Sequence, residues 1–585
     1  MQNGKFGSWN RKETRVYEKS EQKSDFEILS REKNSERLKQ AHSRRAFLKG
    51  LGVAGVAVPL AVVAARAAGQ HPDVLSDTHT QVLDIKNRRD QAFNKRLGAA
   101  ADDHAVKAPP HPNNGDEATY PSGIANFTKG FAHNSFGEVD PGVYASYQAA
   151  VNTGKRQDFD ALVMGGTEAL VDPQAGLAYD LESYDPSQIS IPPADKLNSP
   201  DLAAQLIELY WQALARDVPF SQYGTDPTVA AAASELTGLS SFVVPRIGGD
   251  VTPQSIFRGF TAGDLIGPYI SQFYLQPFSY GAMPFVGYTT TLSGTDFAIE
   301  PRTWLNVQNG APAPLESGYP DPQLRYLRSG RDMAEYVHND VLYQEYLNAT
   351  LILIKMRAPL NSGNPYPPTL KSETGFITFG FPMAEVLVAE VIARALKSAW
   401  FQKWFVHRMA RPEETAGLVH FTLTGQKSYP LDLSVVNSKA AAAVFARNGA
   451  YFMPVSYPEG CPLHPSYPAA HAVVAGAAAT VLKWFFDETF VIPHPVTTTD
   501  DGRGVVPYTG SDAGQMTVGG ELNKLASNVG FGRMFAGIHW RQDVEQGMLL
   551  GEAVAISLLR DQAHLYNENY TGFTFTGFSG NKVTV

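Results

Sequence analysis

The sequence has very little cysteine and little basic charge. Cys461 is the only cysteine in 585 residues, so the chain cannot form an internal disulfide. A zinc cluster of thiolates and an iron–sulfur centre are excluded for the same reason. Residues 1–69 carry 14 basic and 7 acidic side chains; the other 35 basic and 51 acidic ones give residues 70–585 a formal net charge of −16. A nucleic-acid partner is therefore not expected.

A long hydrophobic run is also missing. The apolar stretch from Leu51 to Ala65 is short and rich in Gly and Ala, so no stable membrane span is expected. It is preceded by Ser43-Arg44-Arg45-Ala46-Phe47-Leu48-Lys49 and followed by small residues. This order is typical of a twin-arginine export signal with a long polar n-region, and it predicts a periplasmic or secreted protein. The alternative is a basic amphipathic start to a cytosolic protein.

The rest of the chain divides into three parts by composition. Residues 70–152 are rich in Pro, Gly and Asn, which favours extended arms, with a neighbouring subunit as one possible surface for them to wrap. Residues 153–382 form a helical N-terminal part, with apolar periodicity predicting helices over 201–216 and 332–356. Residues 248–326 are interrupted repeatedly by Gly and Pro and allow no secure assignment.

The third part, residues 383–585, has the most regular periodicity. It predicts a long helix over 383–411 that ends at Pro412, and a second helix over 469–487. Thr517 is the predicted N-cap of a helix that reaches about residue 531, and a last helix covers about 543–564. The fold class is therefore mainly α. The motifs described next fall at helix ends, where unpaired backbone N–H groups attract anions.

Cations and histidines are concentrated in three separated stretches of this part. They are Lys403-Trp404-Phe405-Val406-His407-Arg408-Met409-Ala410-Arg411-Pro412, then His464-Pro465-Ser466-Tyr467-Pro468-Ala469-Ala470-His471, then Gly532-Arg533-Met534-Phe535-Ala536-Gly537-Ile538-His539-Trp540-Arg541-Gln542-Asp543. One Lys and two Arg can neutralise a tetrahedral oxyanion, because each guanidinium fork can hold two oxygens. Lys403, Arg411 and Arg533 can form such a clamp.

The histidines of these stretches suit the same site. His539 is followed by Asp543 at the helical i+4 spacing, so one ring nitrogen can face the oxyanion while nearby groups fix the tautomer. His471 remains as an acid–base candidate. Each residue alone is more often structural: Lys403 as a solvated helix charge, His539 with Asp543 as a structural pair. The order and spacing of all three stretches favour one shared site.

The three stretches resemble the vanadate-binding motifs of the vanadium-dependent haloperoxidases, which are related to the type-2 phosphatidic acid phosphatases. Three other segments resemble the bromoperoxidase branch, and the similarity covers most of residues 110–565. These segments are Leu206-Ile207-Glu208-Leu209-Tyr210-Trp211, Trp304-Leu305-Asn306-Val307-Gln308-Asn309-Gly310 and Gly519-Gly520-Glu521-Leu522-Asn523-Lys524-Leu525. The resemblance implies a helical-bundle fold with few short strands.

The resemblance also implies a role for each site residue. His539 is expected to bond vanadium axially, with Asp543 supporting it, and His471 is expected to be the acid–base residue. His464 matches the second histidine of bromoperoxidases, which favours bromide as the halide. The residues expected to hold the vanadate oxygens are Lys403, Arg411, Arg533 and the backbone N–H of Ala470.

One position departs from the family pattern. The usual Pro-Ser-Gly-His is Pro468-Ala469-Ala470-His471 here. The serine hydroxyl is therefore missing at Ala469, and the methyl group of Ala470 narrows the approach to its N–H. We expect both changes to bear on vanadate affinity and on the rate of halide oxidation.

The implied reaction is oxidation of a halide by hydrogen peroxide, with vanadium(V) keeping its oxidation state. Lys403 is expected to polarise the bound peroxide, and the hypohalous product would halogenate or oxidise an organic acceptor. One alternative is an acid phosphatase of the same superfamily, with His539 as nucleophile. Another is a non-catalytic secreted protein with a decayed site. The resemblance further implies a homo-oligomer, at least a dimer.

Overall fold

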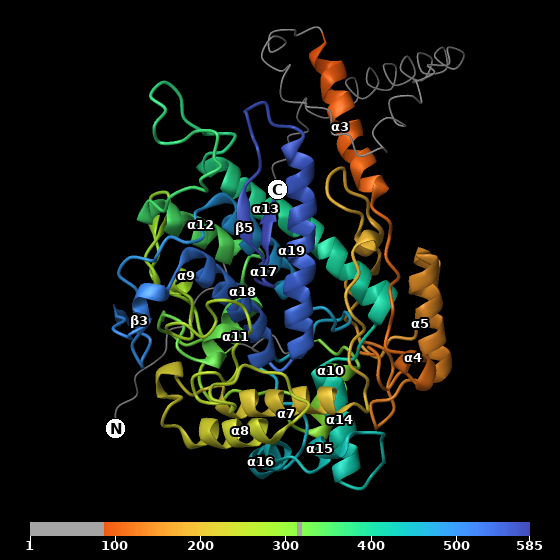
Figure 1. Ribbon diagram of the computed structural model, residues 1–585. Helices are drawn as coiled ribbons and strands as arrows, with labels where there is room; N and C mark the ends of the chain where they lie inside the picture. Colours follow the sequence, from red (N-terminus) through yellow and green to blue (C-terminus); the bar gives the residue numbers. More distant parts are fainter. Residues whose placement is uncertain (1–86, 313–318) are drawn as a thin grey trace, which may run out of the picture. The chain divides into compact units, whose positions relative to one another are not determined.

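The computed structural model describes residues 87–312 and 319–585, so the predicted export signal lies outside the described residues. Figure 1 shows that the regular secondary structure of this part of the chain is mainly helical. The α-helices are α3 (Arg88–Ala105), α4 (Asp116–Thr119), α5 (Pro141–Thr153), α6 (Arg156–Asp160), α7 (Pro200–Ala215), α8 (Pro227–Gly238), α9 (Gln272–Leu275), α10 (Pro301–Gln308), α11 (Gly330–Asn339), α12 (Gln344–Met356), α13 (Phe381–Phe401), α14 (Pro412–Leu423), α15 (Leu433–Val436), α16 (Lys439–Asn448), α17 (Ala470–Phe485), α18 (Val518–Phe535) and α19 (Arg541–Ala563).

The strands are few and short. They form three antiparallel pairs: β1 (Ser279–Tyr280) with β2 (Met283–Pro284), β3 (Val496–Thr498) with β4 (Val505–Pro507), and β5 (Thr574–Thr576) with β6 (Lys582–Thr584). The chain also forms the 3-10 helices η1 (Pro173–Leu177), η2 (Pro186–Gln188), η3 (Phe220–Gln222) and η5 (Ala513–Gln515), and the π-helix η4 (Gln402–His407). The prediction of a mainly α fold with few short strands is confirmed.

A bundle of helices from the C-terminal third forms the centre of the fold. Helix α17 packs against α13, α18 and α19, and α11 packs against α18. Glycine allows α17 and α19 to approach closely, since a Cβ at Gly551 would lie 2.0 Å from the Val473 carbonyl oxygen. A Cβ at Gly476 would lie 2.1 Å from the Met548 oxygen. The two helices are therefore held at a spacing that no larger residue permits.

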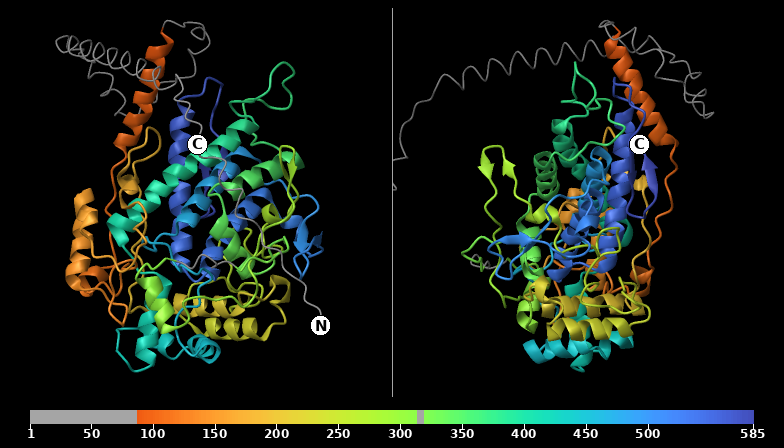
Figure 2. Two further views of the ribbon diagram at one scale, coloured as in Figure 1. Left: turned by 180° about the vertical axis from the view of Figure 1, so that it is seen from behind. Right: turned by 60° about the vertical axis from the view of Figure 1, so that its left-hand side comes forward.

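Helices α7 and α8 cross the end of the bundle where α19 begins, as the views in Figures 1 and 2 agree. A buried ion pair fixes this crossing: Arg541 Nε, in the first turn of α19, lies 2.9 Å from Glu208 Oε2 in α7. Ser199 caps α7, with its Oγ accepting a hydrogen bond from Leu202 N at 3.1 Å. The predicted helix over 201–216 is thus present almost unchanged.

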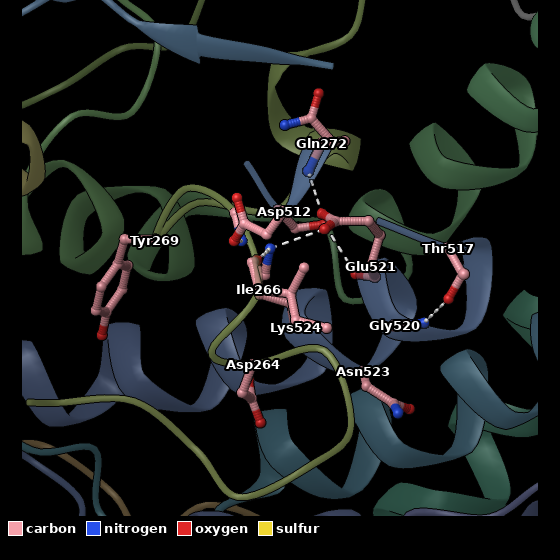
Figure 3. A network of polar contacts seen from close by, with 12 residues as sticks. Asp264, Ile266, Tyr269, Gln272, Asp512, Thr517, Gly520, Glu521, Asn523 and Lys524 are labelled. Atoms are coloured by element: carbon pink, nitrogen blue, oxygen red, sulfur yellow. Dashed lines mark hydrogen bonds and ion pairs between the residues drawn. The ribbon is translucent and has the colours of Figure 1, made fainter. Parts of the chain in front are cut away.

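A buried polar network anchors the N-terminal half of α18 (Figure 3). Thr517 is the N-cap, as predicted, and its Oγ1 accepts from Gly520 N at 3.2 Å. Glu521 accepts from Gln272 N at 2.8 Å and from Lys524 Nζ at 2.7 Å. Because a buried carboxylate is stable only when its hydrogen bonds are made, this network fixes α18 to the segment around α9.

Two predicted long helices are interrupted. Over 332–356 the chain forms α11 and α12, separated at residues 340–343. Over 383–411, α13 ends at Phe401 and η4 follows; Arg408 then adopts a left-handed φ of 44°. Pro412 begins α14 instead of ending the preceding helix. Apolar periodicity continues across both breaks, so it could not reveal them.

The predicted extended segment is also more helical than expected. Within its described residues lie α3, α4 and α5, and α3 packs against the C-terminal end of α19, where Lys95 Nζ donates to the His564 carbonyl oxygen at 2.8 Å. The Pro-rich stretch 106–114 between α3 and α4 contains neither helix nor strand. Across the described ranges, no helix is both long and apolar enough to cross a membrane.

Candidate active site

The ends of several helices meet at one cavity of about 580 Å³. Its lining includes His464, Ala470, His471, Arg533 and His539. Ala470 and His471 begin α17, Arg533 lies in the last turn of α18, and His539 precedes α19. The second and third of the separated sequence stretches therefore meet at this cavity, and Lys403 and Arg411 of the first contact them.

Lys403 lies in the π-helix η4, and its side chain is fully buried. Its Nζ donates to the carbonyl oxygens of Pro465 and Ser466, at 2.7 and 2.6 Å. These carbonyls belong to the second of the three stretches. A buried ammonium held only by backbone dipoles keeps most of its positive charge uncompensated, which favours an anion nearby.

Arg411 connects two of the site histidines. It is the N-cap residue of α14, and its Nη1 lies 2.8 Å from His539 Nε2. Its Nη2 lies 3.0 Å from His464 Nδ1 and donates to the His464 carbonyl oxygen at the same distance. Because a guanidinium can only donate, His539 Nε2 must present its lone pair to Arg411.

The other nitrogen of His539 is held by Asp543. Nδ1 lies 2.7 Å from Asp543 Oδ2, at the predicted i+4 spacing in the first turn of α19. The same oxygen accepts from Trp540 N at 3.1 Å and from Ser466 Oγ at 2.6 Å. Nδ1 therefore carries the proton, and Nε2 carries the lone pair, which accepts from Arg411 in this structure and is the ring atom that could bind a metal.

Arg533 is held from the other side of the site. Its Nη1 donates to the Val337 carbonyl oxygen at 2.6 Å and lies 3.3 Å from the Tyr457 hydroxyl. Its Nε is buried and has no hydrogen-bond partner within the described chain. Gly537, with φ of 81°, turns the chain between α18 and α19, so that Arg533 and His539 reach the same cavity.

The electrostatics of the site are those of a buried cationic cluster. Burial, and then the charge of Arg411, lower the pKa of Lys403 far below its usual range. Burial, Arg411 and Lys403 lower the pKa of His539 in the same direction. Among the described residues, neither Lys403, Arg411 nor Arg533 forms a salt bridge with a carboxylate. An anion would relieve the repulsion among the three cations.

His471 and His464 have different surroundings. His471 Nε2 lies 3.1 Å from Asp340 Oδ1, and its side chain is 16% exposed. The ring of His464 packs against Trp400 with centroids 4.8 Å apart. Burial, and then the charges of Lys403 and Arg411, lower the pKa of His464 well below its usual range. His471 alone of the two is paired with a carboxylate that can stabilise an added proton.

The donor set fits a tetrahedral oxyanion whose central atom accepts a nitrogen ligand. Buried cations surround the site, one guanidinium nitrogen of Arg533 has no partner among the described residues, and His539 Nε2 is an acceptor. The first turn of α17 adds backbone N–H groups at Ala470 and His471. Orthovanadate is such an anion, and vanadium(V) accepts imidazole nitrogen.

Comparison with known proteins agrees with this chemistry. The chain is 36% identical to a vanadium-dependent bromoperoxidase of Ascophyllum nodosum over 519 residues, 84% of this chain and 91% of the relative. The chain belongs to the vanadium-dependent bromoperoxidase family. It is also 32% identical to a vanadium-dependent bromoperoxidase of Corallina officinalis, over 86% of this chain and 99% of that protein. A family model described as the VCPO second helical-bundle domain matches residues 386–568.

A solved structure of the family has the same fold. The homohexameric second vanadate-dependent bromoperoxidase of Ascophyllum nodosum superposes with a TM-score of 0.82 at 32% identity, covering 89% of this chain and 95% of that one. The predicted resemblance and helical-bundle fold are confirmed. The roles predicted for individual residues stay predictions, although the structure brings every one of those residues to the site.

Several supporting residues of the site were not found from the sequence. These are Asp340, which contacts His471, Ser466, which contacts Asp543, and Tyr457, which contacts Arg533. Asp340 lies 131 positions before His471. No local spacing rule connects residues so far apart. Ser466 lies in the second of the three stretches, but the spacing of the sequence does not indicate its contact with Asp543.

Ala469 is the N-cap residue of α17. It is fully buried, and its backbone N–H donates to the Asp543 carbonyl oxygen at 2.9 Å. The methyl side chain makes no capping hydrogen bond to the helix. The family's serine at this position would carry a hydroxyl that can serve either the helix or an anion.

Proposed function

We propose that this chain is a vanadate-dependent haloperoxidase that oxidises bromide with hydrogen peroxide, and that His539 Nε2 would bind vanadium. The observation that carries the proposal is the fixed tautomer of His539. Asp543 accepts a hydrogen bond from the protonated Nδ1, and the Nε2 lone pair faces a buried group of cations. In this arrangement a neutral imidazole can bind the metal while the cations neutralise the anionic oxygens.

The chain's own residues bind and orient the reactants. Lys403, Arg411 and Arg533 hold oxygens by charge-assisted hydrogen bonds, and Lys403 withdraws electron density from the peroxide. His471 accepts a proton from hydrogen peroxide, and the Asp340 carboxylate stabilises the resulting imidazolium. Bound vanadate supplies Lewis-acid activation of the peroxide without a change in oxidation state. In the overall reaction bromide is oxidised by two electrons as the O–O bond of hydrogen peroxide breaks: one oxygen leaves in hypobromous acid, and the other takes up a proton and leaves as water. The hypobromous acid would then react with an organic acceptor.

Bromide is favoured over chloride by His464. This histidine lines the cavity next to Trp400, and the family resemblance places a second active-site histidine at its position. The relatives that cover most of the chain are named as bromoperoxidases. Comparing turnover with bromide, chloride and iodide tests this choice. Faster turnover with chloride than with bromide would contradict it.

Reconstitution tests the cofactor. Apoprotein prepared with a chelator at low pH should regain bromide-dependent peroxide consumption when vanadate is added, and competing phosphate should reduce it, because both anions occupy the same cationic site. Activity that is indifferent to both anions contradicts the proposal. Hydrolysis of phosphate esters by the apoprotein, with no bromide oxidation after vanadate is added, would instead assign the chain to the phosphatase alternative.

We also propose export by the twin-arginine route and assembly into a homo-oligomer. The motif Ser43-Arg44-Arg45 supports export, and the homohexameric relative supports assembly. Replacing Arg44 and Arg45 by Lys should keep the precursor in the cytoplasm, because the route reads the arginine pair while the charge is unchanged. Shortened protein outside the inner membrane would contradict export. A monomer in analytical ultracentrifugation would contradict assembly.

A further inference from the structure

The guanidinium group of Arg533 is attached to the protein through one of its three nitrogens. Nη1 donates to the Val337 carbonyl oxygen at 2.6 Å and to Tyr457 Oη at 3.3 Å, so both of its N–H groups are used. Within the described part of the chain, neither Nε nor Nη2 has an acceptor. Nε and Nη2 form the edge that can donate two parallel hydrogen bonds to one anion. That edge is therefore left for an oxyanion in the cavity.

Tyr457 holds Arg533 with a hydroxyl group whose direction is fixed. The side chain is 1% exposed, and its hydroxyl donates to the Ala334 carbonyl oxygen at 2.6 Å. Because the only hydrogen of this group is used in that bond, the oxygen presents a lone pair to Arg533 Nη1. The guanidinium carbon also lies 5.2 Å from the centroid of the tyrosine ring, which attracts a cation.

The C-terminal half of α11 supplies the partners of both side chains. Ala334, Val337 and His338 have i, i+3 and i+4 spacing, so they share one face of the helix. The carbonyl of Val337 is among the last four of α11, which have no donor within the helix and carry the negative end of its dipole. The end of α11 therefore attracts the guanidinium group that α18 supplies.

His338 supports the ring of Tyr457. The two rings are stacked, with centroids 3.8 Å apart and planes 9° from parallel. The histidine is itself held, because its Nε2 lies 2.6 Å from Glu459 Oε1. Tyr457 therefore cannot tilt unless His338 moves, and its hydroxyl cannot turn away from Arg533 unless it loses its bond to Ala334.

We propose that Tyr457, supported by His338, is a positioning residue for Arg533: with the Val337 carbonyl it occupies both N–H groups of Nη1 and so directs the Nε–Nη2 edge to the oxyanion. The assignment of that oxyanion as vanadate rests on the proposed function, whereas the contacts of Tyr457 do not. Without the hydroxyl, Nη1 has a spare donor, and the guanidinium group can bind the anion in several orientations instead of one.

The first test compares Tyr457→Phe with Tyr210→Phe as the matched control. Tyr210 in α7 is also fully buried, and its hydroxyl also donates to a backbone carbonyl at 2.6 Å, that of Tyr451. Calorimetric titration of the vanadate-free protein with sulfate at one fixed pH measures the affinity for a tetrahedral oxyanion. We expect about three- to tenfold weaker binding in Tyr457→Phe and the parent affinity in Tyr210→Phe. Parent-like affinity in Tyr457→Phe, or equal losses in both variants, overturns the proposal.

A double-mutant cycle determines whether the effect passes through Arg533. Arg533→Lys keeps the positive charge but has a single nitrogen and no edge to direct. In the Arg533→Lys background we therefore expect Tyr457→Phe to change sulfate affinity by less than about twofold. A loss as large as that in the parent background would show that Tyr457 acts by another route, and would overturn the proposal.

A third comparison leaves Tyr457 in place. His338→Ala and His338→Phe both remove the contact with Glu459, but only the phenylalanine keeps a ring stacked on Tyr457. Sulfate should bind about threefold more weakly to His338→Ala than to His338→Phe. Equal affinities overturn the proposal. Failure of the proposed function would be seen as absent bromide turnover in the reconstituted parent, whereas failure of this inference is seen in the sulfate affinities of the vanadate-free variants.

Discussion

Two of the histidine–carboxylate pairs beside the cavity have different neighbours. His539 and Asp543 are completely buried beside Lys403 and Arg411. His471 is partly exposed, and its partner Asp340 lies in the break between α11 and α12. In the first pair the surrounding cations oppose protonation of the ring, which leaves a lone pair for a metal. In the second pair the ring contacts a carboxylate and lines the cavity. The same two residue types therefore suit ligation in one place and proton transfer in the other.

The largest effect should separate the two pairs directly. His539→Ala removes the axial ligand, so we expect it to abolish both vanadate binding and bromide turnover. His471→Ala should retain vanadate affinity near that of the parent while turnover falls by about 10²–10⁴-fold, the usual contribution of a general acid–base group. Titration of each variant with vanadate measures the affinity, and bromide-dependent peroxide consumption measures the turnover. Equal losses of affinity in the two variants would remove the distinction.

Lys403→Ala should have the next largest effect. The variant loses one of three cations and the group expected to polarise the peroxide, so some vanadate should still bind while turnover falls by about 10²–10³-fold, as for loss of one transition-state donor. Arg408→Ala is the matched control, because Arg408 lies five residues away and pairs with Glu117 at 2.5 Å. A near-normal rate in Lys403→Ala would contradict its role.

The apoprotein should take up protons when it binds an anion. The pKa of Lys403 is depressed in the free cluster by burial and by Arg411, and a bound anion raises it again. The affinity for the anion must therefore increase as pH falls. This dependence on pH ends where Lys403 is already protonated in the anion-free protein. Sulfate is a suitable probe because its own charge is constant between pH 5 and about 9. Calorimetry in buffers of different ionisation enthalpy measures the uptake, which should be smaller in Lys403→Gln.

Ala469→Ser should have the smallest effect. The new hydroxyl can donate to an anionic oxygen, a charge-assisted bond worth about 1.5–3 kcal/mol. It can also cap α17, which stabilises a helix by about 1 kcal/mol. We expect a lower vanadate concentration for half-reconstitution and a higher melting temperature. If only the melting temperature rises, the hydroxyl serves the helix and does not face the cofactor.

The difference between the pairs also explains what the sequence could predict. Asp543 was found because it follows His539 by four residues, although in the structure His539 precedes α19 and only Asp543 lies in its first turn. Asp340 was not found, because it sits in the break between α11 and α12, and apolar periodicity continues through that break. Lys403, Arg411 and Arg533 were found from residue type and joint pattern. Their burial, and the carbonyl partners of Lys403, depend on packing between distant segments.

Because Lys403 lies in a π-helix, the site should be sensitive to the deletion of a residue from that segment of the chain. Each residue advances an α-helix by about 100°, and a π-turn holds one residue more than an α-turn. Deleting a single residue within Gln402–His407 could therefore restore a regular helix at no cost in backbone hydrogen bonds, and would rotate the ammonium group away from the other two cations. Point substitutions around Lys403 leave its direction intact. The position of this charge is thus set by the number of residues in one turn.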